Sequence, residues 1–348
     1  MAKQNPLSSC ADLTSSADKV RKILPEFFPY KGYIAIGSWI LKIQSTHQYF
    51  IHSISSYYKQ SLKKEPPKKN GYHDICMYLV SCKDARFFCD NNSIPYDSMH
   101  ASSTKGKNLF IATRLIRVAV FKNKGPAEIF VFIKDPLKNK RIFKAHFLIA
   151  MYKILLFFKK FYAHAGAIKF KKKVYLFFGE KSAGKSTICL NLAKKGARII
   201  SDDHVMLTKG AKRMFVSGSE ETSRIDKRTE RHLFTSALKI KPKRIGSRLK
   251  KEFLLAPHFS TAPYQDFKVD SIFFINRTGE FSIKKIPKIE VVLRLLSSSR
   301  RLFRFKQHNE FEEYLHFFSG LGKNLNAFIL QLGNRKLSDL DRIESFLK

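Results

Sequence analysis

A short segment constrains this chain more than any other feature. Residues 179–187 read GEKSAGKST and match the phosphate-binding pattern G-x-x-x-x-G-K-[ST] in full. A bound triphosphate needs a concave row of backbone N–H donors, a cation near its outer phosphates and a hydroxyl on its magnesium ion. The two glycines would let the backbone wrap closely, Lys185 would supply the cation and Ser186 the metal ligand. The predicted phosphate contacts are Gly179, Glu180, Lys181, Ser182, Ala183, Gly184, Lys185, Ser186 and Thr187.

The flanks of this motif predict a strand, a loop and a helix. Residues 174–178 form a short apolar and aromatic run that is typical of a buried strand. After Gly184, apolar residues recur at helical spacing, and Gly196 is a helix stop signal. Such a helix would aim its N-terminus at the bound anion. The alternative is a chance match on a lysine-rich surface loop, and both flanks argue against it.

The charge of the chain is strongly positive. Among 348 residues, 65 are Lys or Arg and 28 are Asp or Glu, which gives a formal net charge of +37. Such a surface attracts nucleic acid, anionic lipid or acidic proteins. The basic residues are spread over most of the chain, however, and no nucleic-acid-binding motif accompanies them. We expect no dedicated nucleic-acid site; coding bias is the other explanation of the charge.

Cysteine usage and hydropathy indicate a cytoplasmic protein. The five cysteines form neither a paired framework nor a CxxC metal site. The polar N-terminus lacks the apolar core of a secretory signal. The longest apolar stretch, 145–158, is too short to span a bilayer. We therefore expect no transmembrane segment.

Composition and patterning predict two domains after a tail. Residues 1–22 read as a flexible tail, 23–140 as a small β-rich α+β domain and 141–348 as a larger α/β domain. Strand-like runs in the small domain are 30–43, 75–80, 85–89, 109–112, 116–121 and 129–133, while 49–62 fits a strand or a helix.

The larger domain is predicted to open with a helix over about 145–162, followed by strands at 164–170 and 198–201. Residues 209–268 look basic and irregular, as substrate loops would. Residues 270–276 and 281–286 are expected to pair around the turn 277–279. A strand at 327–332 and a helix at 337–347 complete the pattern.

Two carboxylates follow the strand after the loop helix. In an open α/β sheet, ligands bind beyond the carboxyl ends of the strands, so Asp202 and Asp203 are expected to face the terminal phosphate. Phosphoryl transfer needs a metal near the outer phosphates and a group that orients or deprotonates the acceptor. One carboxylate could do each task. Taken alone, the pair also fits a solvated turn, and His164 fits a structural histidine.

These elements together resemble the catalytic core of the HPr kinase/phosphorylase family. The segment HAGAI begins at His164, 21 residues before Lys185, and Asp202 and Asp203 stand 17 and 18 residues after it. The resemblance implies a P-loop kinase domain with a mixed sheet, like phosphoenolpyruvate carboxykinase, that uses ATP and Mg²⁺. It also implies that Lys185 binds the phosphates and that Ser186 and Asp202 serve the metal. Asp203 would be the general base, and His164 would support the reacting phosphate.

The chain departs from this family in its later part. The Arg-Gly segment that supplies a metal-binding glutamate is not found; Glu220 and Glu221 lie in the corresponding region. Arg244 and Arg248 are the candidates for the family's late catalytic arginine. The chain is therefore similar to a divergent kinase. We expect it to act on a hydroxyl of a protein, a peptide or a small molecule, and a homo-oligomer is compatible with the sequence. A non-catalytic ATP-binding module is the second hypothesis.

Overall fold

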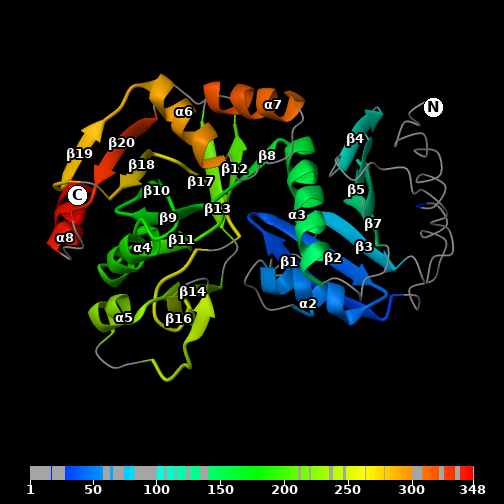
Figure 1. Ribbon diagram of the computed structural model, residues 1–348, viewed down its shortest axis with the longest axis horizontal. Coiled ribbons are helices and arrows are strands. Elements are labelled where there is room, and N and C mark those ends of the chain that lie inside the picture. Colours follow the sequence, from blue (N-terminus) through cyan, green and yellow to red (C-terminus); the bar gives the residue numbers. More distant parts are fainter. Residues whose placement is uncertain are drawn as a thin grey trace. The chain divides into compact units, whose positions relative to one another are not determined.

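A computed structural model describes most of the chain in a mixed α/β arrangement (Figure 1). The described residues are 17, 28–57, 63–65, 74–81, 100–105, 108–113, 116–122, 126–133, 140–210, 213–218, 221–234, 238–245, 248–262, 264–277, 279–299, 308–320, 325–333 and 338–347. The chain divides into two compact units, residues 1–159 and 160–348.

The first unit is built on a seven-stranded sheet with the order β1-β2-β3-β7-β6-β5-β4. Its strands are β1 (Tyr30–Ile36), β2 (Trp39–Ser45), β3 (Ile75–Ser81), β4 (His100–Lys105), β5 (Asn108–Thr113), β6 (Ile116–Phe121) and β7 (Ala127–Ile133). Strand β3 runs parallel to both of its neighbours, and the other pairs are antiparallel. Helices α2 (Gln48–Tyr57) and α3 (Lys140–Phe157) complete the described elements of this unit.

Most strand predictions for this unit are confirmed. The run 30–43 is two strands rather than one, because Gly37 takes a left-handed φ of 61° and turns the chain back as a hairpin. The ambiguous segment 49–62 contains a helix, α2. Strand β4 was not predicted, and residues 85–89 lie outside the described part of the chain.

The helix predicted over 145–162 is wrong at both ends. Helix α3 covers Lys140–Phe157, and Lys159 stops it in the left-handed region with a φ of 57°. The aromatic residues that follow form β8 (Lys160–Ala163), whose partner is β12 (Val205–Lys209). Aromatic side chains pack well on a pleated, half-buried surface, and here that preference prevails over helical continuation.

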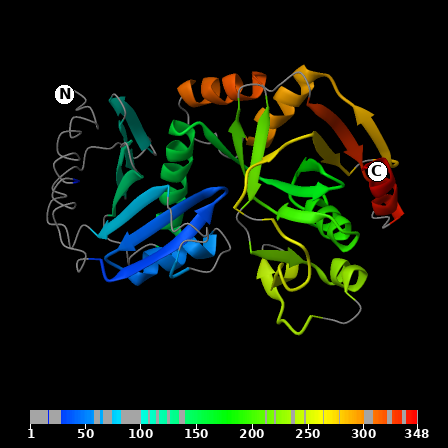
Figure 2. The ribbon, with the colours of Figure 1, turned by 180° about the vertical axis from the view of Figure 1, so that it is seen from behind.

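The central layer of the second unit is a six-stranded sheet with the order β11-β9-β10-β18-β20-β19 (Figure 2). Its strands are β9 (Ala165–Phe170), β10 (Lys173–Gly179), β11 (Arg198–Ser201), β18 (Ser271–Asn276), β19 (Ser282–Lys285) and β20 (Asn326–Gln331). Strands β10, β18 and β20 are parallel. Strand β9 is antiparallel to both β10 and β11, so β10 and β11 point the same way.

Helices cover both faces of this sheet. Helices α4 (Lys185–Lys194) and α8 (Ser338–Leu347) share one core with Phe177 and Phe273. On the next residue of β18, Phe274 points to the opposite face, where Arg294 of α6 (Lys288–Ser299) lies over its ring. Helix α7 (His308–Ser319) stacks its aromatic residues on Phe161 of β8.

The predicted pairing of 270–276 with 281–286 is wrong, because β20 lies between β18 and β19. Strand β18 is buried along almost its whole length and needs neighbours on both sides. Strand β19 is largely exposed, which suits an edge position. The strand expected at 327–332 and the helix expected at 337–347 are confirmed as β20 and α8.

The region 209–268 is more regular than predicted. It holds β13 (Met214–Gly218), β14 (Thr222–Ile225), β15 (Lys243–Ile245), β16 (Arg248–Leu254), β17 (Phe267–Lys268) and α5 (Lys227–Leu233). These strands form a sheet β17-β13-β12-β8 and a sheet β14-β16-β15. The many charged residues of β15 and β16 concealed the strand pattern there. None of the helices in the described residues combines the length and apolar character needed to cross a membrane.

Candidate functional site

The loop between β10 and α4 is tightly curled, and steric constraints explain why glycine stands at residues 179 and 184. A Cβ on Gly179 would lie 3.0 Å from Ala183 Cβ and 3.1 Å from the carbonyl oxygen of Ile275 on β18. Gly184 has a φ of 111°, and Ser182 also lies in the left-handed region with a φ of 70°. The Ala183 N–H donates to the Glu180 carbonyl at 3.1 Å. The backbone therefore folds back on itself directly before α4.

The start of α4 concentrates positive charge at this loop. Its N-cap is Gly184, which offers no side-chain cap, so the helix N-terminus adds its partial positive charge there. Lys185 is only 6% exposed and donates from Nζ to the carbonyl oxygens of Gly179 at 2.8 Å and Glu180 at 3.2 Å. The ammonium group thus lies inside the curve of the loop.

A second cation, Arg277, lies against the same loop. Its Nε donates to the Ala183 carbonyl at 2.9 Å, and a terminal nitrogen lies 3.2 Å from where a Cβ on Gly184 would be. Arg277 follows β18, the parallel neighbour of β10, so both strands deliver their carboxyl ends to this edge. Sequence reasoning missed it, because only the strand order brings Arg277 to the loop.

The acidic pair reaches the same edge of the sheet. Strand β11 ends there because it points the same way as β10, and β9 begins there because it runs the other way. A Cβ on Gly166 would lie 3.8 Å from Lys185 Cβ and 3.7 Å from the Asp202 carbonyl oxygen. The phosphate-type loop and the end of β11 are therefore packed side by side.

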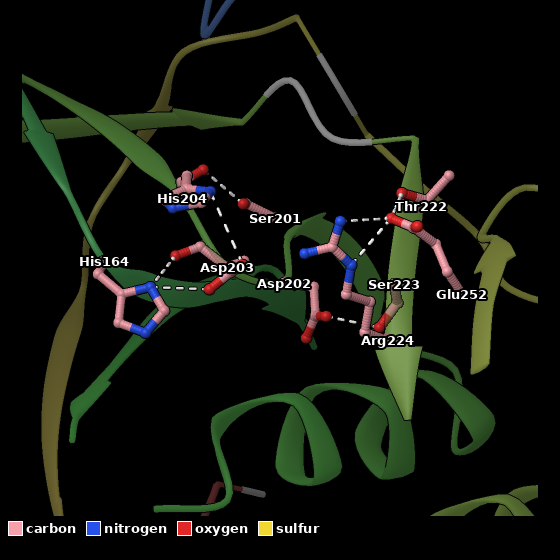
Figure 3. Close-up of polar contacts among 9 residues, drawn as sticks. All are labelled: His164, Ser201, Asp202, Asp203, His204, Thr222, Ser223, Arg224 and Glu252. Carbon is pink, nitrogen blue, oxygen red and sulfur yellow. Dashed lines mark hydrogen bonds and ion pairs between the residues drawn. The ribbon is translucent and has the colours of Figure 1, made fainter. Parts of the chain in front are cut away.

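Asp202 and Asp203 have different surroundings, as Figure 3 shows. Asp202 is 2% exposed, and the Ser223 hydroxyl donates to its Oδ2 at 2.5 Å. The Asp203 side chain is 26% exposed and forms an ion pair with His164, with 2.7 Å between Oδ1 and Nδ1. The same Nδ1 lies 2.9 Å from the Asp203 carbonyl oxygen. One carboxylate is thus held in the interior and the other faces the surface.

Strand β14 supplies the partner of Asp202. Along β14, Ser223 is buried, whereas its neighbour Arg224 is paired with Glu252 through Nε at 2.9 Å and a terminal nitrogen at 2.8 Å (Figure 3). This alternation is the ordinary period of a strand. Ser223 was missed, because no motif marks a serine that reaches the site from another sheet.

The remaining sequence candidates are placed only in part. Glu221 accepts a hydrogen bond from the Tyr264 hydroxyl at 2.9 Å; burial, together with the Glu221 charge, raises the pKa of that phenol. Glu220 lies outside the described residues, as do the side chains of Arg244 and Arg248. Thr187 lies in α4, with its hydroxyl 3.4 Å from that of Thr229. The loop residues Glu180, Lys181 and Ser182 are exposed, and Ser186 is half-buried.

Comparison with known proteins yields remote structural likeness only. No protein-family model matches the chain, and no curated protein matches it. Among solved structures, the HPr(Ser) kinase/phosphatase from Coxiella burnetii is similar over 53% of this chain and 87% of that chain. The identity is 12% and the TM-score is 0.29. At that score, the likeness carries no argument about fold or activity.

Proposed function

We propose that this chain is an ATP- and Mg²⁺-dependent phosphotransferase that acts on a hydroxyl of a protein, a peptide or a small molecule. The proposal includes a P-loop kinase fold of the HPr kinase type for the second unit. One observation carries it: the loop and the end of β11 pack against the same position. A Cβ on Gly166 would lie within 4 Å of both Lys185 Cβ and the backbone carbonyl oxygen of Asp202. Phosphoryl transfer requires this kind of meeting, because cations must hold the phosphates while a carboxylate receives a proton.

The loop has the parts needed to hold a triphosphate. Lys185 already points its ammonium group into the loop, where it donates to two backbone carbonyls. Phosphate oxygens are stronger acceptors than carbonyls, so a bound nucleotide would take over these hydrogen bonds. The uncapped N-terminus of α4 and the guanidinium group of Arg277 add positive charge on either side.

The donor set also fits a magnesium ion. Mg²⁺ is a hard cation that prefers oxygen ligands, and the Ser186 hydroxyl and the Asp202 carboxylate supply them. The hydrogen bond from Ser223 fixes Asp202 in its buried position. When bound, the ion would neutralise charge on the outer phosphates.

Asp203 is the proposed general base. Its partly exposed carboxylate is accessible to an acceptor hydroxyl, and His164 restrains it through Oδ1. In the reaction, the hydroxyl oxygen forms a bond to the γ-phosphorus as its proton passes to Asp203. The bond from the γ-phosphorus to the bridging oxygen breaks, and ADP leaves with that oxygen's electron pair. Most of the rate would come from positioning and electrostatics.

The test combines a transfer assay with a binding assay. The purified chain is incubated with γ-labelled ATP, Mg²⁺ and fractionated cell lysate, and nucleotide binding is followed separately with a fluorescent ATP analogue. Asp203→Asn should abolish label transfer and leave the nucleotide Kd within about twofold, because the base would contact the acceptor hydroxyl and not the nucleotide. Asp266→Asn, which removes an exposed carboxylate outside the predicted site residues, is the matched control.

A second pair of variants tests the loop. Lys185→Met should weaken nucleotide binding and transfer together, whereas Lys241→Met at an exposed position should change neither. Label transfer retained in full by Asp203→Asn would refute the base assignment. Nucleotide binding without transfer to any lysate fraction would favour the non-catalytic ATP-binding module. A wild-type chain that binds no ATP with Mg²⁺ would end the proposal altogether.

A further inference from the structure

Three side chains with ligand atoms of the kind that bind transition metals meet at the proposed base, Asp203, which is one of them. The available ligand atoms of His164, Asp203 and His204 all lie within 4.8 Å of one another. In the described part of the chain, no other set of three His, Cys, Asp or Glu residues has this arrangement. The two imidazoles flank one carboxylate: His164 Nδ1 is 2.7 Å from Oδ1, and His204 Nδ1 is 3.8 Å from Oδ2 (Figure 3).

We propose that His164, Asp203 and His204 form a binding site for a divalent transition metal, with Zn²⁺ as the fitting ion. Two imidazole nitrogens and one carboxylate oxygen match the ligand preference of Zn²⁺ and leave a fourth position for water. The proposed magnesium site uses different ligands, the oxygen atoms of Ser186 and Asp202. A hard Mg²⁺ ion would compete poorly for the two nitrogens.

The three side chains are held close to their places before any ion arrives. The ring of His204 stacks on Tyr162 with 5.2 Å between centroids and 18° between planes. The His204 carbonyl also accepts a hydrogen bond from the Ser201 hydroxyl at 2.6 Å. The rings of His164 and His204 lie 5.6 Å apart. Their side chains are 40% and 21% exposed, so a hydrated ion can reach them.

Metal binding requires one proton to move. His164 Nδ1 faces two acceptors, the Oδ1 and the carbonyl oxygen of Asp203, and the tautomer with its proton on Nδ1 would satisfy both. A zinc ion would replace this proton between imidazole and carboxylate. The proton would leave to solvent if the ring was doubly protonated, or the ring would take the other tautomer, with its proton on Nε2. No oxidation or reduction is involved.

The consequence for activity rests on the proposed function. A zinc ion on Asp203 occupies the lone pair that would receive the acceptor's proton, so transfer should stop. The loop that holds the nucleotide lies outside the ligand set, so ATP binding should persist. Zinc would therefore inhibit without competing with ATP.

The experiment measures metal binding directly in the full chain. Chelator-stripped protein is titrated with Zn²⁺ against a chromophoric indicator, and with Co²⁺ by visible absorption. His204→Gln should weaken zinc binding at least about tenfold, because even loss of an outer partner of a metal ligand typically costs that much. His52→Gln, an exposed histidine on α2, should leave it unchanged. His204→Cys keeps a ligand at this position and should retain Co²⁺ binding with an added thiolate absorption band.

Melting temperatures show whether each variant is folded, and His204→Cys keeps the test decisive if His204→Gln is not. Zinc and cobalt binding by His204→Gln at wild-type strength would overturn the site. In the transfer assay, each protein is compared with its own zinc-free activity; zinc should inhibit the wild type and spare His204→Gln. A chain that binds zinc as expected but transfers no phosphate would disprove the proposed function and leave the metal site standing. Phosphate transfer by a chain whose zinc binding does not change with the residue at position 204 would support the proposed function and disprove the metal site.

Discussion

The contact between Gly166 and Cys189 is the most direct test of how β9 and α4 position the loop. A Cβ at residue 166 would lie 2.6 Å from Cys189 Sγ, whereas its next neighbours, at 3.7 and 3.8 Å, are at ordinary contact distance. A relaxed contact needs about 3.5 to 4 Å, so Gly166→Ala forces a shift of about 1 Å. Cys189 is fully buried, and its sulfur has no solvent to turn into. Overpacking of this kind costs about 1 to 3 kcal/mol.

A double-mutant cycle isolates this clash. Cys189→Ala alone removes one buried heavy atom and should cost about 1 kcal/mol. In the double variant, the new methyl group occupies the space that the sulfur leaves. The stability lost by the double variant should therefore be about 1 to 2 kcal/mol smaller than the sum of the losses of the two single variants. Hydrogen exchange of the α4 amides reports this locally, with about tenfold faster exchange for each 1.4 kcal/mol of lost stability.

Two further readings make the test sharp. The single tryptophan, Trp39, lies in the first unit, so its fluorescence during denaturation serves as an internal reference. The shift should also move the start of α4 and weaken binding of a fluorescent nucleotide by Gly166→Ala, with recovery in the double variant. The packing argument would be refuted if the α4 amides of Gly166→Ala exchanged hydrogen at the wild-type rate. It would also be refuted if the stability losses of the two single variants were strictly additive in the double variant.

Three further changes have defined outcomes. Arg277→Ala should raise the nucleotide Kd about fivefold, because the loop loses a charged donor worth about 1 kcal/mol at this exposed position, and fluorescence titration measures it. Burial disfavours the charged form of Glu230, but hydrogen bonds led by that from Lys251 outweigh it and lower the pKa of Glu230 below its usual 4.5. The resulting stability is present above pH 4.5 and lost as the pH falls through the lowered pKa. The free energy of unfolding, measured as the pH is lowered from 4.5, should therefore fall less steeply for Lys251→Met than for the wild type. Ser223→Ala should raise the Mg²⁺ concentration for half-maximal transfer about tenfold, because it removes the donor that fixes Asp202.

The local parts of the fold could be predicted from sequence. The strand before residue 179 and the helix after it are confirmed as β10 and α4, because each carries its own hydrophobic period and stop signal. The failures are of another kind. The expected hairpin of 270–276 with 281–286 is wrong because β20, which begins 40 residues after residue 286, enters between its strands. Sequence patterns describe segments, whereas strand order depends on which surfaces can be buried together.

The same limit governs the site. The loop and the acidic pair carry local patterns and were found as candidates, while Ser223, His204 and Arg277 were not. Ser223 and Arg277 reach the loop or the carboxylates only through strands of distant sequence. His204 is adjacent to the acidic pair, but a lone histidine at the start of a strand carries no signal of its own. Its position beside Asp203 becomes meaningful only with His164 on the facing segment.

The two neighbouring carboxylates differ because the chain changes sheets between them. Strand β11 ends in the six-stranded sheet at Ser201, and β12 begins in another sheet at Val205. The segment from β8 to β9 makes the same crossing at His164. The two crossings lie side by side because β8 pairs with β12 and β9 pairs with β11. Asp202 directly follows the buried end of β11 and is itself buried, whereas Asp203 is partly exposed and meets His164. In a regular strand, the side chains of Asp202 and Asp203 would also point to opposite faces of the sheet. Helices cover both faces of the six-stranded sheet, so both carboxylates would then be buried. The crossing instead leaves one carboxylate in the interior and one at the surface. The proposed phosphoryl transfer would need this division between a metal ligand and a base.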